Sequence, residues 1–363
     1  MKKLFKLLSV LLALAMMLAL AACGSSGGTS DPSSAPSSTS TPSTNDADAS
    51  SGTGDTSAGD ASDGGSAADG ATYTVGICQL VQHDALDQAT QGFKDALTEK
   101  LGDAVSFKEG NASGDSANCS TIIDGFLSDG VDLILANATA PLQAAAAATS
   151  EIPILGTSIT DYATALEIDD WTGTVGSNIS GTSDLAPLDQ QAAMLHEMFP
   201  DAQNVGLLYC SGEPNSVYQC DVITGYLEEY GYTVERYAFT DTNDVTSVAQ
   251  TAADNSDVIY IPTDNTAASN TEAIANVVLP AGVPVIAGEE GIASGCGVAT
   301  LSISYYDLGY TTGEMAYEIL ANGADVSTMA IEYAPEVTAK YNAANCEALS
   351  ITPPEGYEPI ETE

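Results

Sequence analysis

Polar side chains that could bind a small zwitterion follow the apolar runs of this chain. Among them are Gln79, His83, Ser158, Thr160 and Asp161 in the first half of the sequence, and Ser211, Asn215, Asp264, Asn265 and Glu289 in the second half. Hydroxyl and amide groups beside helix N-termini can donate hydrogen bonds to a carboxylate. Asp161, Asp264 and Glu289 could match an ammonium group. These residue types therefore indicate a ligand that carries both charges.

The same residue types are also the commonest helix N-caps, so capping alone accounts for any single one of them. What a cap does not account for is their concentration. They occur at the ends of all eight apolar runs described below, in both halves of the chain. This concentration favours a binding cleft.

The motifs of the common enzyme classes are missing from the sequence. There is no GxSxG nucleophile elbow, no GxxxxGK[ST] phosphate loop, no HExxH zinc motif and no GxGxxG fingerprint. His83 and Asp87 are four residues apart and could share a helix face, but a metal site there would need further carboxylates, because the chain has 2 histidines. We therefore predict a protein without enzymatic activity, metal or cofactor.

Six cysteines follow residue 23: Cys78, Cys119, Cys210, Cys220, Cys296 and Cys346. Their spacing contains no CxxC pair and no zinc pattern. Cys78 falls inside an apolar run, where we expect a buried thiol. Disulfide connectivity cannot be deduced from these positions, and no pair is predicted.

The elements that position the polar residues form an internal repeat. Four apolar, β-rich runs in the first half have four counterparts about 130 residues later. The runs of the first half are Thr74–Leu80, Val105–Asn111, Val131–Asn137 and Ile152–Ser158, and those of the second are Val205–Cys210, Thr233–Phe239, Val258–Pro262 and Val283–Gly288.

Helical periodicity separates the apolar runs. Examples are Leu86/Ala89/Phe93/Leu97, Ile122/Ile123/Phe126/Leu127 and Leu188/Ala192/Leu195/Phe199. Strands that alternate with helices form parallel sheets covered on both faces. We predict an α/β protein of two similar lobes, with the candidate residues beyond the carboxyl ends of the strands, where such sheets bind ligands.

Charge excludes several partners. The chain has 8 Lys and Arg residues against 50 Asp and Glu residues, a formal net charge of -42. Binding of nucleic acid depends on Lys and Arg and is excluded, and adhesion to anionic lipid is disfavoured. An anionic ligand is also disfavoured unless backbone N–H groups supply the positive potential.

The N-terminus predicts export. Lys2, Lys3 and Lys6 precede an apolar run, Leu7–Ala19, which is too short to span a membrane as a mature helix. The run ends at Leu-Ala-Ala-Cys-Gly, which resembles the lipobox of bacterial lipoproteins, whose cysteine is lipidated. We therefore predict a lipoprotein signal peptide over residues 1–23 and lipidation of Cys23.

Residues 24–71 contain only Ser, Gly, Thr, Asp, Ala, Pro and Asn. A segment of this composition cannot bury enough apolar surface to offset its ordering entropy. We predict a disordered acidic linker, with folded sequence from about Thr72.

Runs across the folded sequence resemble one known family. They include GICQLVQHDALD, GNASGDSANC, IPILGTSITD, SNISGTSDLAP, GLLYCSGEPNSVYQ, IYIPTDNTAAS and YYDLGYTTGEMA. They look like the solute-binding lipoproteins of ABC transporters of the aromatic-amino-acid type, which have the type I periplasmic-binding-protein fold. The resemblance covers about Tyr73 to Cys346, and PTDNT, SGEPNSV and the QxVxH start are its most specific motifs.

The resemblance implies the same candidate residues and adds others. Thr182, Ser183 and Asp184 would lie near the first crossing between the lobes. Tyr305, with Tyr306 or Leu80, could provide a wall for an aromatic ligand side chain. Asp264 and Asp184 are the candidates for the ammonium, and Ser158 and Thr160 those for the carboxylate.

The resemblance also implies the function. The protein would be a lipid-anchored, extracytoplasmic monomer that binds an amino acid, expected to be aromatic, between two closing lobes. It would deliver the ligand to an ABC permease in the membrane, driven by a cytoplasmic ATPase. The alternatives are a sugar- or nucleoside-binding protein of the same fold and a lipid-tethered ligand-sensing domain.

The expected domain boundaries follow from a multi-strand hinge. Residues 72–183 and 290–325 would form the first lobe. Residues 184–289 and 326–351 would form the second lobe, and 352–363 a C-terminal tail.

Overall fold

The apolar runs form strands in the computed structural model, which describes residues 71–334 and 336–361. All of these residues belong to one compact unit, Gly64–Glu363. The eight predicted strands are all present, with ends within two residues of the predicted ones. The predicted signal peptide, Cys23 and the linker up to residue 70 lie outside the described residues.

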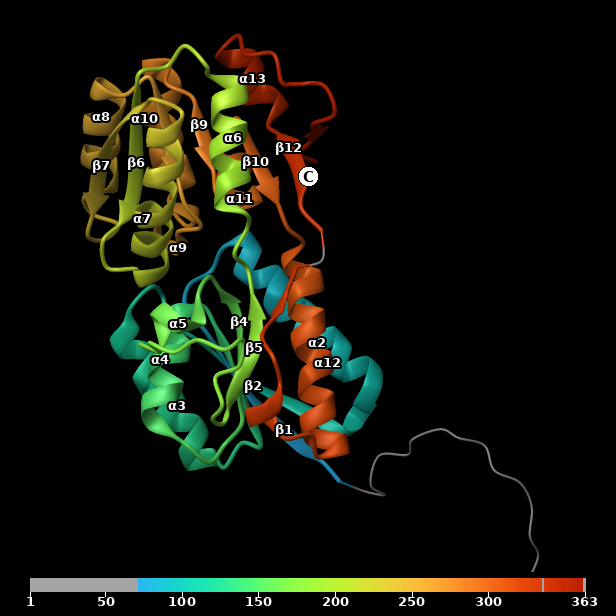
Figure 1. Ribbon diagram of the computed structural model, residues 1–363. Helices are drawn as coiled ribbons and strands as arrows, with labels where there is room; N and C mark the ends of the chain where they lie inside the picture. Colours follow the sequence, from blue (N-terminus) through green and yellow to red (C-terminus); the bar gives the residue numbers. More distant parts are fainter. Residues whose placement is uncertain (1–70, 335, 362–363) are drawn as a thin grey trace, which may run out of the picture. The chain divides into compact units, whose positions relative to one another are not determined.

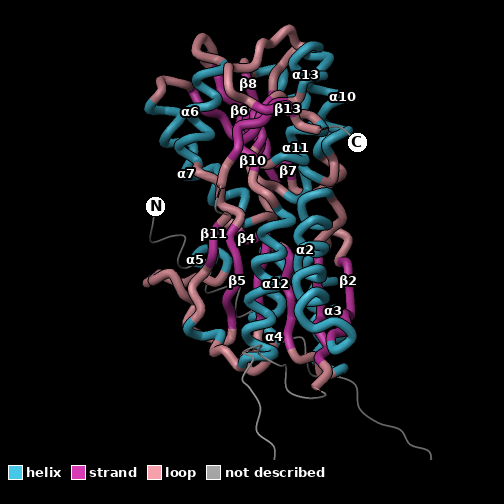
Figure 2. The backbone as a smooth tube through the Cα atoms, turned by 90° about the vertical axis from the view of Figure 1, so that its right-hand side faces the viewer, coloured by secondary structure: helices cyan, strands magenta, loops and turns pink. Residues whose placement is uncertain are grey.

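The first lobe is built on a six-stranded parallel sheet of order β11-β5-β4-β3-β1-β2 (Figures 1 and 2). Its strands are β1 (Tyr73–Gln79), β2 (Val105–Asn111), β3 (Leu133–Asn137), β4 (Ile154–Ile159), β5 (Ile179–Ser183) and β11 (Glu332–Tyr333). Its helices are α2 (Asp84–Leu101), α3 (Ser116–Asp129), α4 (Thr139–Ala148), α5 (Tyr162–Ala165) and α12 (Tyr305–Asn322), with the 3-10 turns Gly102–Ala104 and Val326–Thr328.

The second lobe is built on a seven-stranded sheet of order β13-β12-β10-β9-β8-β6-β7. Its strands are β6 (Asn204–Cys210), β7 (Thr233–Phe239), β8 (Val258–Ile261), β9 (Val285–Ala287), β10 (Ala299–Ser302), β12 (Thr338–Tyr341) and β13 (Glu358–Pro359). Its helices are α6 (Leu188–Met198), α7 (Pro214–Glu229), α8 (Val245–Asn255), α9 (Asn265–Ala268), α10 (Thr271–Ala281), α11 (Glu290–Gly295) and α13 (Ala343–Ala348). The pair β10–β12 is antiparallel. The prediction of a wholly parallel sheet is therefore wrong for this lobe.

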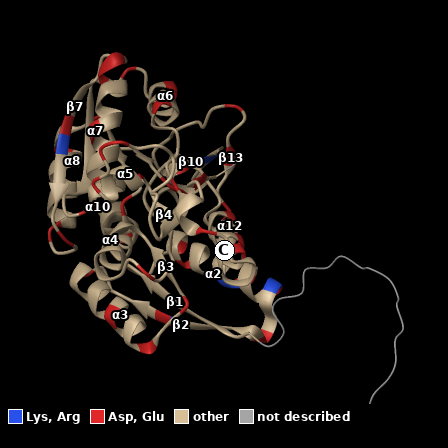
Figure 3. Ribbon diagram, turned by 60° about the horizontal axis from the view of Figure 1, so that its bottom comes forward, with Lys and Arg blue, Asp and Glu red and all other residues tan. Residues whose placement is uncertain are grey.

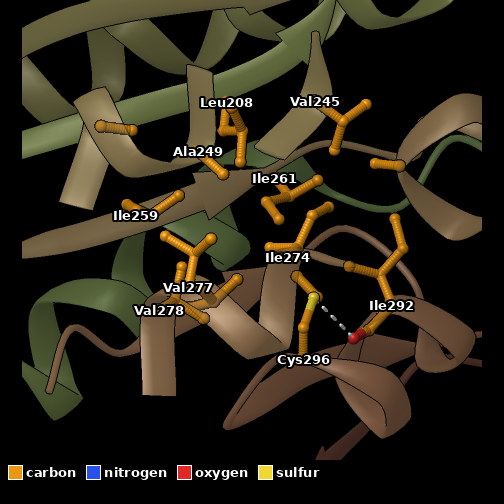
Figure 4. Packing of buried hydrophobic residues seen from close by; sticks show 14 of the residues in the cluster. Leu208, Val245, Ala249, Ile259, Ile261, Ile274, Val277, Val278, Ile292 and Cys296 are labelled. Carbon is orange, nitrogen blue, oxygen red and sulfur yellow. Dashed lines mark hydrogen bonds between the residues drawn. The ribbon is translucent and has the colours of Figure 1, made fainter. Parts of the chain in front are cut away.

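Both sheets are covered on both faces, because alternate strand residues contribute to different apolar clusters. In β1, Val75 and Ile77 face one cluster with Phe93 of α2, whereas Cys78 faces another with Ile123 of α3. In the second lobe, Leu208 and Ile261 pack against Ile274 of α10 in one of its two clusters (Figure 4). The predicted fold class, two α/β lobes with helices on both faces, is confirmed.

The chain crosses between the lobes three times, as a multi-strand hinge requires. The first crossing follows β5 at Ser183, as predicted. The second lies between β10 and α12, near residue 303, not at residue 290, because β10 pairs with β9 in the second sheet. The third lies after β11, which pairs with β5, so that residues 326–333 belong to the first lobe. The predicted tail contains β13, which pairs with β12.

Candidate ligand-binding site

A small cavity lies where the two lobes face each other. Polar side chains at the carboxyl ends of the strands dominate its lining. The first lobe contributes His83, Leu86, Ser158, Thr160, Asp184 and Tyr305, and the second contributes Asn215, Thr263, Asp264, Asn265, Ala268 and Glu289. The cavity measures about 10 Å³, which is room for about one water molecule. An amino acid could therefore enter only if the facing side chains or the lobes move apart.

Asp184 lines the cavity and has one carboxylate oxygen without a partner in the protein. The residue follows β5 and is 4% exposed. Its Oδ2 accepts a hydrogen bond from the Tyr305 hydroxyl at 3.0 Å, whereas its Oδ1 has no hydrogen-bond partner within the protein. Burial raises the pKa of this carboxyl to about 6. A buried carboxylate with an unpaired oxygen is costly unless a cationic or hydrogen-bonding group of a ligand meets it.

Ser158 is directed by an irregularity in β4. The β4–β5 register shifts between Gly156 and Ile159, and Ser158 has a φ of 56°, in the left-handed region that side chains other than glycine rarely adopt. Its Oγ is buried and has no hydrogen-bond partner within the protein. Strained residues of this kind concentrate at ligand sites, and here the strain accompanies an unpaired hydroxyl beside the cavity.

Asp264 and Glu289 are already engaged as helix caps. Asp264 accepts hydrogen bonds from the amides of Cys210 (2.7 Å) and Ala267 (2.8 Å), the latter at the start of α9. Glu289 accepts from Gly291 (2.6 Å) and Ile292 (2.5 Å) at the start of α11. Burial raises the pKa of Glu289 to about 7, and burial with the nearby Glu213 carboxylate raises that of Asp264.

Asn265 connects the two lobes through a hydrogen bond. His83 Nε2 and Asn265 Oδ1 are 3.2 Å apart. The Asn265 amide nitrogen donates to Glu213 at 2.8 Å, which orients the amide oxygen toward His83. Burial lowers the pKa of His83, although the hydrogen bond with Asn265 opposes that shift. A neutral His83 would then donate its Nε2–H across the cavity.

Nine of the fourteen predicted ligand-binding residues line this cavity, and five do not. The five form hydrogen bonds elsewhere in the protein. Gln79 bonds to Val81, Asp87 and Thr90, and Asp161 caps α5. Thr182 bonds to Thr157, Thr312 and Tyr162 inside the first lobe, Ser183 bonds to Thr160 and Leu185, and the exposed Ser211 bonds to Phe239. Their side chains serve the architecture around the site.

Sequence reasoning missed three lining residues, Leu86, Thr263 and Ala268. Thr263 stands one residue before Asp264 in the PTDNT motif and could have been included on position alone. Leu86 and Ala268 gave no signal, because apolar residues at helix starts are ordinary core residues. Of the proposed apolar walls, Tyr305 lines the cavity, whereas Leu80 is buried in a core cluster and Tyr306 is 37% exposed and bonds to Asp95.

Two features are absent from the part of the chain that the structure describes. Within it, no group of three or more His, Cys, Asp and Glu side chains is arranged to hold a metal ion. No helix among the same residues is both long and apolar enough to cross a membrane.

The two facing α/β lobes, hinged at three crossings, with polar groups at the strand ends, define the class of type I periplasmic-binding-protein folds. The chain belongs to the family of ABC transporter substrate binding proteins, whose sequence profile matches residues 74–357. It is similar to a tyrosine-binding protein of Clostridioides difficile (strain R20291), with 34% identity over 280 residues, 76% of this chain and 81% of that protein.

Solved structures agree with this assignment. A domain from Streptococcus pneumonia, in complex with L-Trp, has 29% identity and a TM-score of 0.76, covering 80% of this chain and 100% of that chain. The ligand-free, open structure of a substrate binding protein with adhesive properties from Clostridium difficile has 34% identity and a TM-score of 0.62, with the same coverage. As an ABC substrate-binding protein, the chain acts outside the cytoplasm.

Proposed function

We propose that this substrate-binding protein captures an aromatic L-amino acid between its lobes and releases it unchanged to the permease. The observation that carries the proposal is Asp184, a buried carboxylate that lines the cavity and whose Oδ1 has no hydrogen-bond partner within the protein. A ligand ammonium would supply the missing partner. The relatives that bind tyrosine and L-Trp support the ligand class.

Asp184 is a better ammonium partner than Asp264. Both oxygens of Asp264 accept backbone hydrogen bonds, and the same holds for Glu289. These two carboxylates would therefore act on the ligand through their charge, whereas Asp184 could bond to it directly. The two candidates for the ammonium that the sequence predicted thus reduce to one.

The ligand carboxylate would be bound by hydroxyl groups. Ser158 offers an unpaired Oγ, and Thr160 lines the same part of the cavity. No Lys or Arg is among the lining residues. A second carboxylate on the ligand would meet Asp184, Asp264 and Glu289 without a cation to balance it, so glutamate and aspartate should bind poorly. Leu86, Ala268 and the ring of Tyr305 are the apolar surfaces for the ligand side chain.

The test is calorimetric titration of refolded, ligand-free protein. We expect micromolar or tighter binding of Trp, Tyr or Phe, weaker binding of Leu, and no binding of Glu, ribose or adenosine. Recovery of the ligand unchanged after incubation would support binding without catalysis. Heat from ribose or adenosine, with none from any amino acid, would replace this proposal by its sugar or nucleoside alternative.

A pair of matched variants tests the ammonium partner. Asp184→Asn removes the charge that the ligand ammonium would meet, and leaving a buried charge unmatched costs roughly 3–5 kcal/mol, a hundredfold or more in Kd. Asp161→Asn is the control, because Asp161 caps α5 outside the cavity. We expect the control to bind as the wild type does. Equal affinities of both variants would move the ammonium site elsewhere.

We also propose that lipid on Cys23 anchors the protein to the outer face of the cell membrane, as a monomer. The Leu-Ala-Ala-Cys-Gly sequence supports this proposal. In cells fed a labelled fatty acid, Cys23→Ala should lose the label, while a change of Ser25 to Ala should retain it. Equal labelling of both variants would contradict the anchor.

Deletion of a neighbouring permease gene should abolish uptake of the ligand, whereas a sensing domain would leave uptake intact.

A further inference from the structure

Two cysteines outside the ligand cavity, both free thiols, belong to the same apolar cluster of the first lobe. Cys78 lies on β1 and Cys119 near the start of α3, and both side chains are fully buried (0% exposed) in one apolar cluster. Forty residues separate them in sequence, so the fold and not the local chain brings them together. Neither thiol belongs to the binding machinery described above.

The backbone holds the start of α3 against the end of β1. The Ala112 amide donates to the Gln79 carbonyl at 2.9 Å, and the Gly114 amide donates to the Leu80 carbonyl at 2.9 Å. Asp115 then caps α3 by accepting from Ala117 at 2.8 Å. Cys119 follows within the first turns of this helix, directly above the carboxyl end of β1, where Cys78 stands.

Glycines allow α3 to approach the sheet closely. A Cβ on Gly76 would lie 2.6 Å from the Phe126 ring, and one on Gly110 would lie 2.6 Å from Ile122. Gly76 and Cys78 share a face of β1, since alternate strand residues point the same way, and Cys119 and Phe126 are two helical turns apart on one face of α3. The close contact at Gly76 and Phe126 therefore continues to Cys78 and Cys119.

The two thiols influence each other's ionisation in the folded protein. Cys119 Sγ donates toward the Asp115 carbonyl at 3.8 Å, so its lone pairs remain open to the thiol of Cys78. A hydrogen bond from Cys78 to Cys119, together with burial, raises the pKa of the Cys78 thiol, and the same hydrogen bond lowers the pKa of Cys119.

We propose that Cys78 and Cys119 form a disulfide after export, which ties α3 to β1. The oxidant is a disulfide, either of an extracytoplasmic oxidoreductase or of a small thiol. One of the two cysteine thiolates attacks it and releases one oxidant thiolate. The other cysteine thiolate then attacks the sulfur of the first and releases the second, so that two electrons and the two cysteine protons pass to the oxidant. Because both residues are buried, the exchange takes place before the first lobe has packed.

Peptide mapping tests the bond. The full-length protein is purified from the cell surface, denatured without reductant, alkylated with N-ethylmaleimide, digested and analysed by mass spectrometry. A second sample is reduced, denatured and refolded in a mixture of glutathione and glutathione disulfide. We expect peptides joined through Cys78 and Cys119 in both samples. Alkylated Cys78 and Cys119 in both samples, or a bond from either to another cysteine, would overturn the proposal.

Matched variants separate this bond from other effects of reduction. Reductant should lower the Tm of the wild type by roughly 5 °C or more, because the bond closes a loop of about 40 residues. Cys296→Ala should retain that fall, since the Cys296 thiol, equally buried, donates to the Ile292 carbonyl at 3.4 Å. Cys119→Ala should abolish the fall, with ligand affinity unchanged. A fall that persists in Cys119→Ala would contradict the proposal.

Discussion

At the scale of single residues, the ionisation of Asp184 should control ligand affinity. Burial raises the pKa of this carboxyl to about 6 without ligand, and only the ionised form matches an ammonium. Affinity should therefore be constant from about pH 8 to pH 7 and fall up to about tenfold per pH unit below pH 6. Calorimetric titration at a series of pH values measures this dependence.

Other groups around the cavity could also titrate in this range. They are His83, Asp264 and Glu289. The Asp184→Asn variant shows which group causes the pH dependence, because this variant should bind the ligand weakly at every pH, without a step in affinity near pH 6. A step that remains in this variant would assign the titration to another of these groups.

The same buried carboxyls predict how stability depends on pH. The folded-state pKa of Asp184 is raised to about 6 and that of Glu289 to about 7, and the pKa of Asp264 is raised too. The folded protein therefore binds these protons more tightly than the unfolded chain, and their contribution to stability is present at low pH and lost as the pH rises through about 6–7.

The melting temperature should consequently rise by several degrees between pH 8 and pH 5. His83 opposes the trend, because its lowered pKa favours the neutral form in the folded state. One histidine is outweighed by three carboxyls. Melting curves in buffers of equal ionic strength give the answer, and a melting temperature that falls steadily from pH 8 to pH 5 would contradict the expectation.

The site was predictable from the sequence only where side-chain chemistry and strand position coincide. Asn215, Asp264 and Glu289 were found in this way, whereas Asp184 was implied by the resemblance to a known family. Whether a carboxylate serves a ligand or a helix was not predictable, because Asp161 and Asp184 differ in their hydrogen bonds and not in their type. The register shift in β4 that directs Ser158 was also not predictable, because no residue pattern in the sequence indicates it.

At the scale of secondary-structure elements, the strands that are apolar because both of their faces are buried are the ones that the sequence predicts best. Strands such as β3 and β6 are apolar throughout because both faces of their sheets are covered, and they were predicted almost to the residue. Near the hinge, β5 reads ISGTS and β10 reads ATLS, with little apolar content to mark them. Because β10 was not recognised, the second crossing was placed thirteen residues too early.

The contact between α2 and α12 should be sensitive to a single methyl group. These helices lie side by side in the first lobe (Figure 2). A Cβ on Gly309 of α12 would lie 1.9 Å from the Ala89 carbonyl oxygen of α2, so the helices must separate to accept it. Gly309→Ala should therefore lower the free energy of unfolding by about 1–3 kcal/mol, as overpacking does.

Gly225 of α7 is the matched control. It is also a helical glycine, but a Cβ there would have nothing within 4 Å. Gly225→Ala should stabilise the protein by about 0.4–1 kcal/mol, because alanine restricts the unfolded chain and favours the helix. Urea denaturation of both variants measures the difference. Equal effects of the same sign would show that helix propensity, and not the close contact, governs Gly309.

At the scale of the whole molecule, the dominant feature is unbalanced negative charge. Residues 72–363 hold 43 acidic and five basic side chains. Each of the five bases is paired in the structure: Lys94 with Glu109, Lys100 with Glu314, Lys108 with Asp129, Arg236 with Asp221 and Lys340 with Glu290. Among the residues that the structure describes, the other acids have no Lys or Arg partner and are spread over both lobes (Figure 3).

Salt should therefore raise the melting temperature. It weakens the five ion pairs, but these are at least partly exposed, and such pairs contribute at most about 1 kcal/mol each. Salt also screens the repulsion among the unpaired acids, which outnumber the ion pairs several-fold. The screening is strong, because the Debye length shrinks from about 30 Å at 0.01 M to below 8 Å at 0.5 M. Melting curves in sodium chloride from about 0.01 M to about 0.5 M test this balance, with choline chloride as a control for specific sodium binding. An equal rise with both cations would identify screening as the cause, and a flat or falling melting temperature would show that the acids are too dispersed to repel one another.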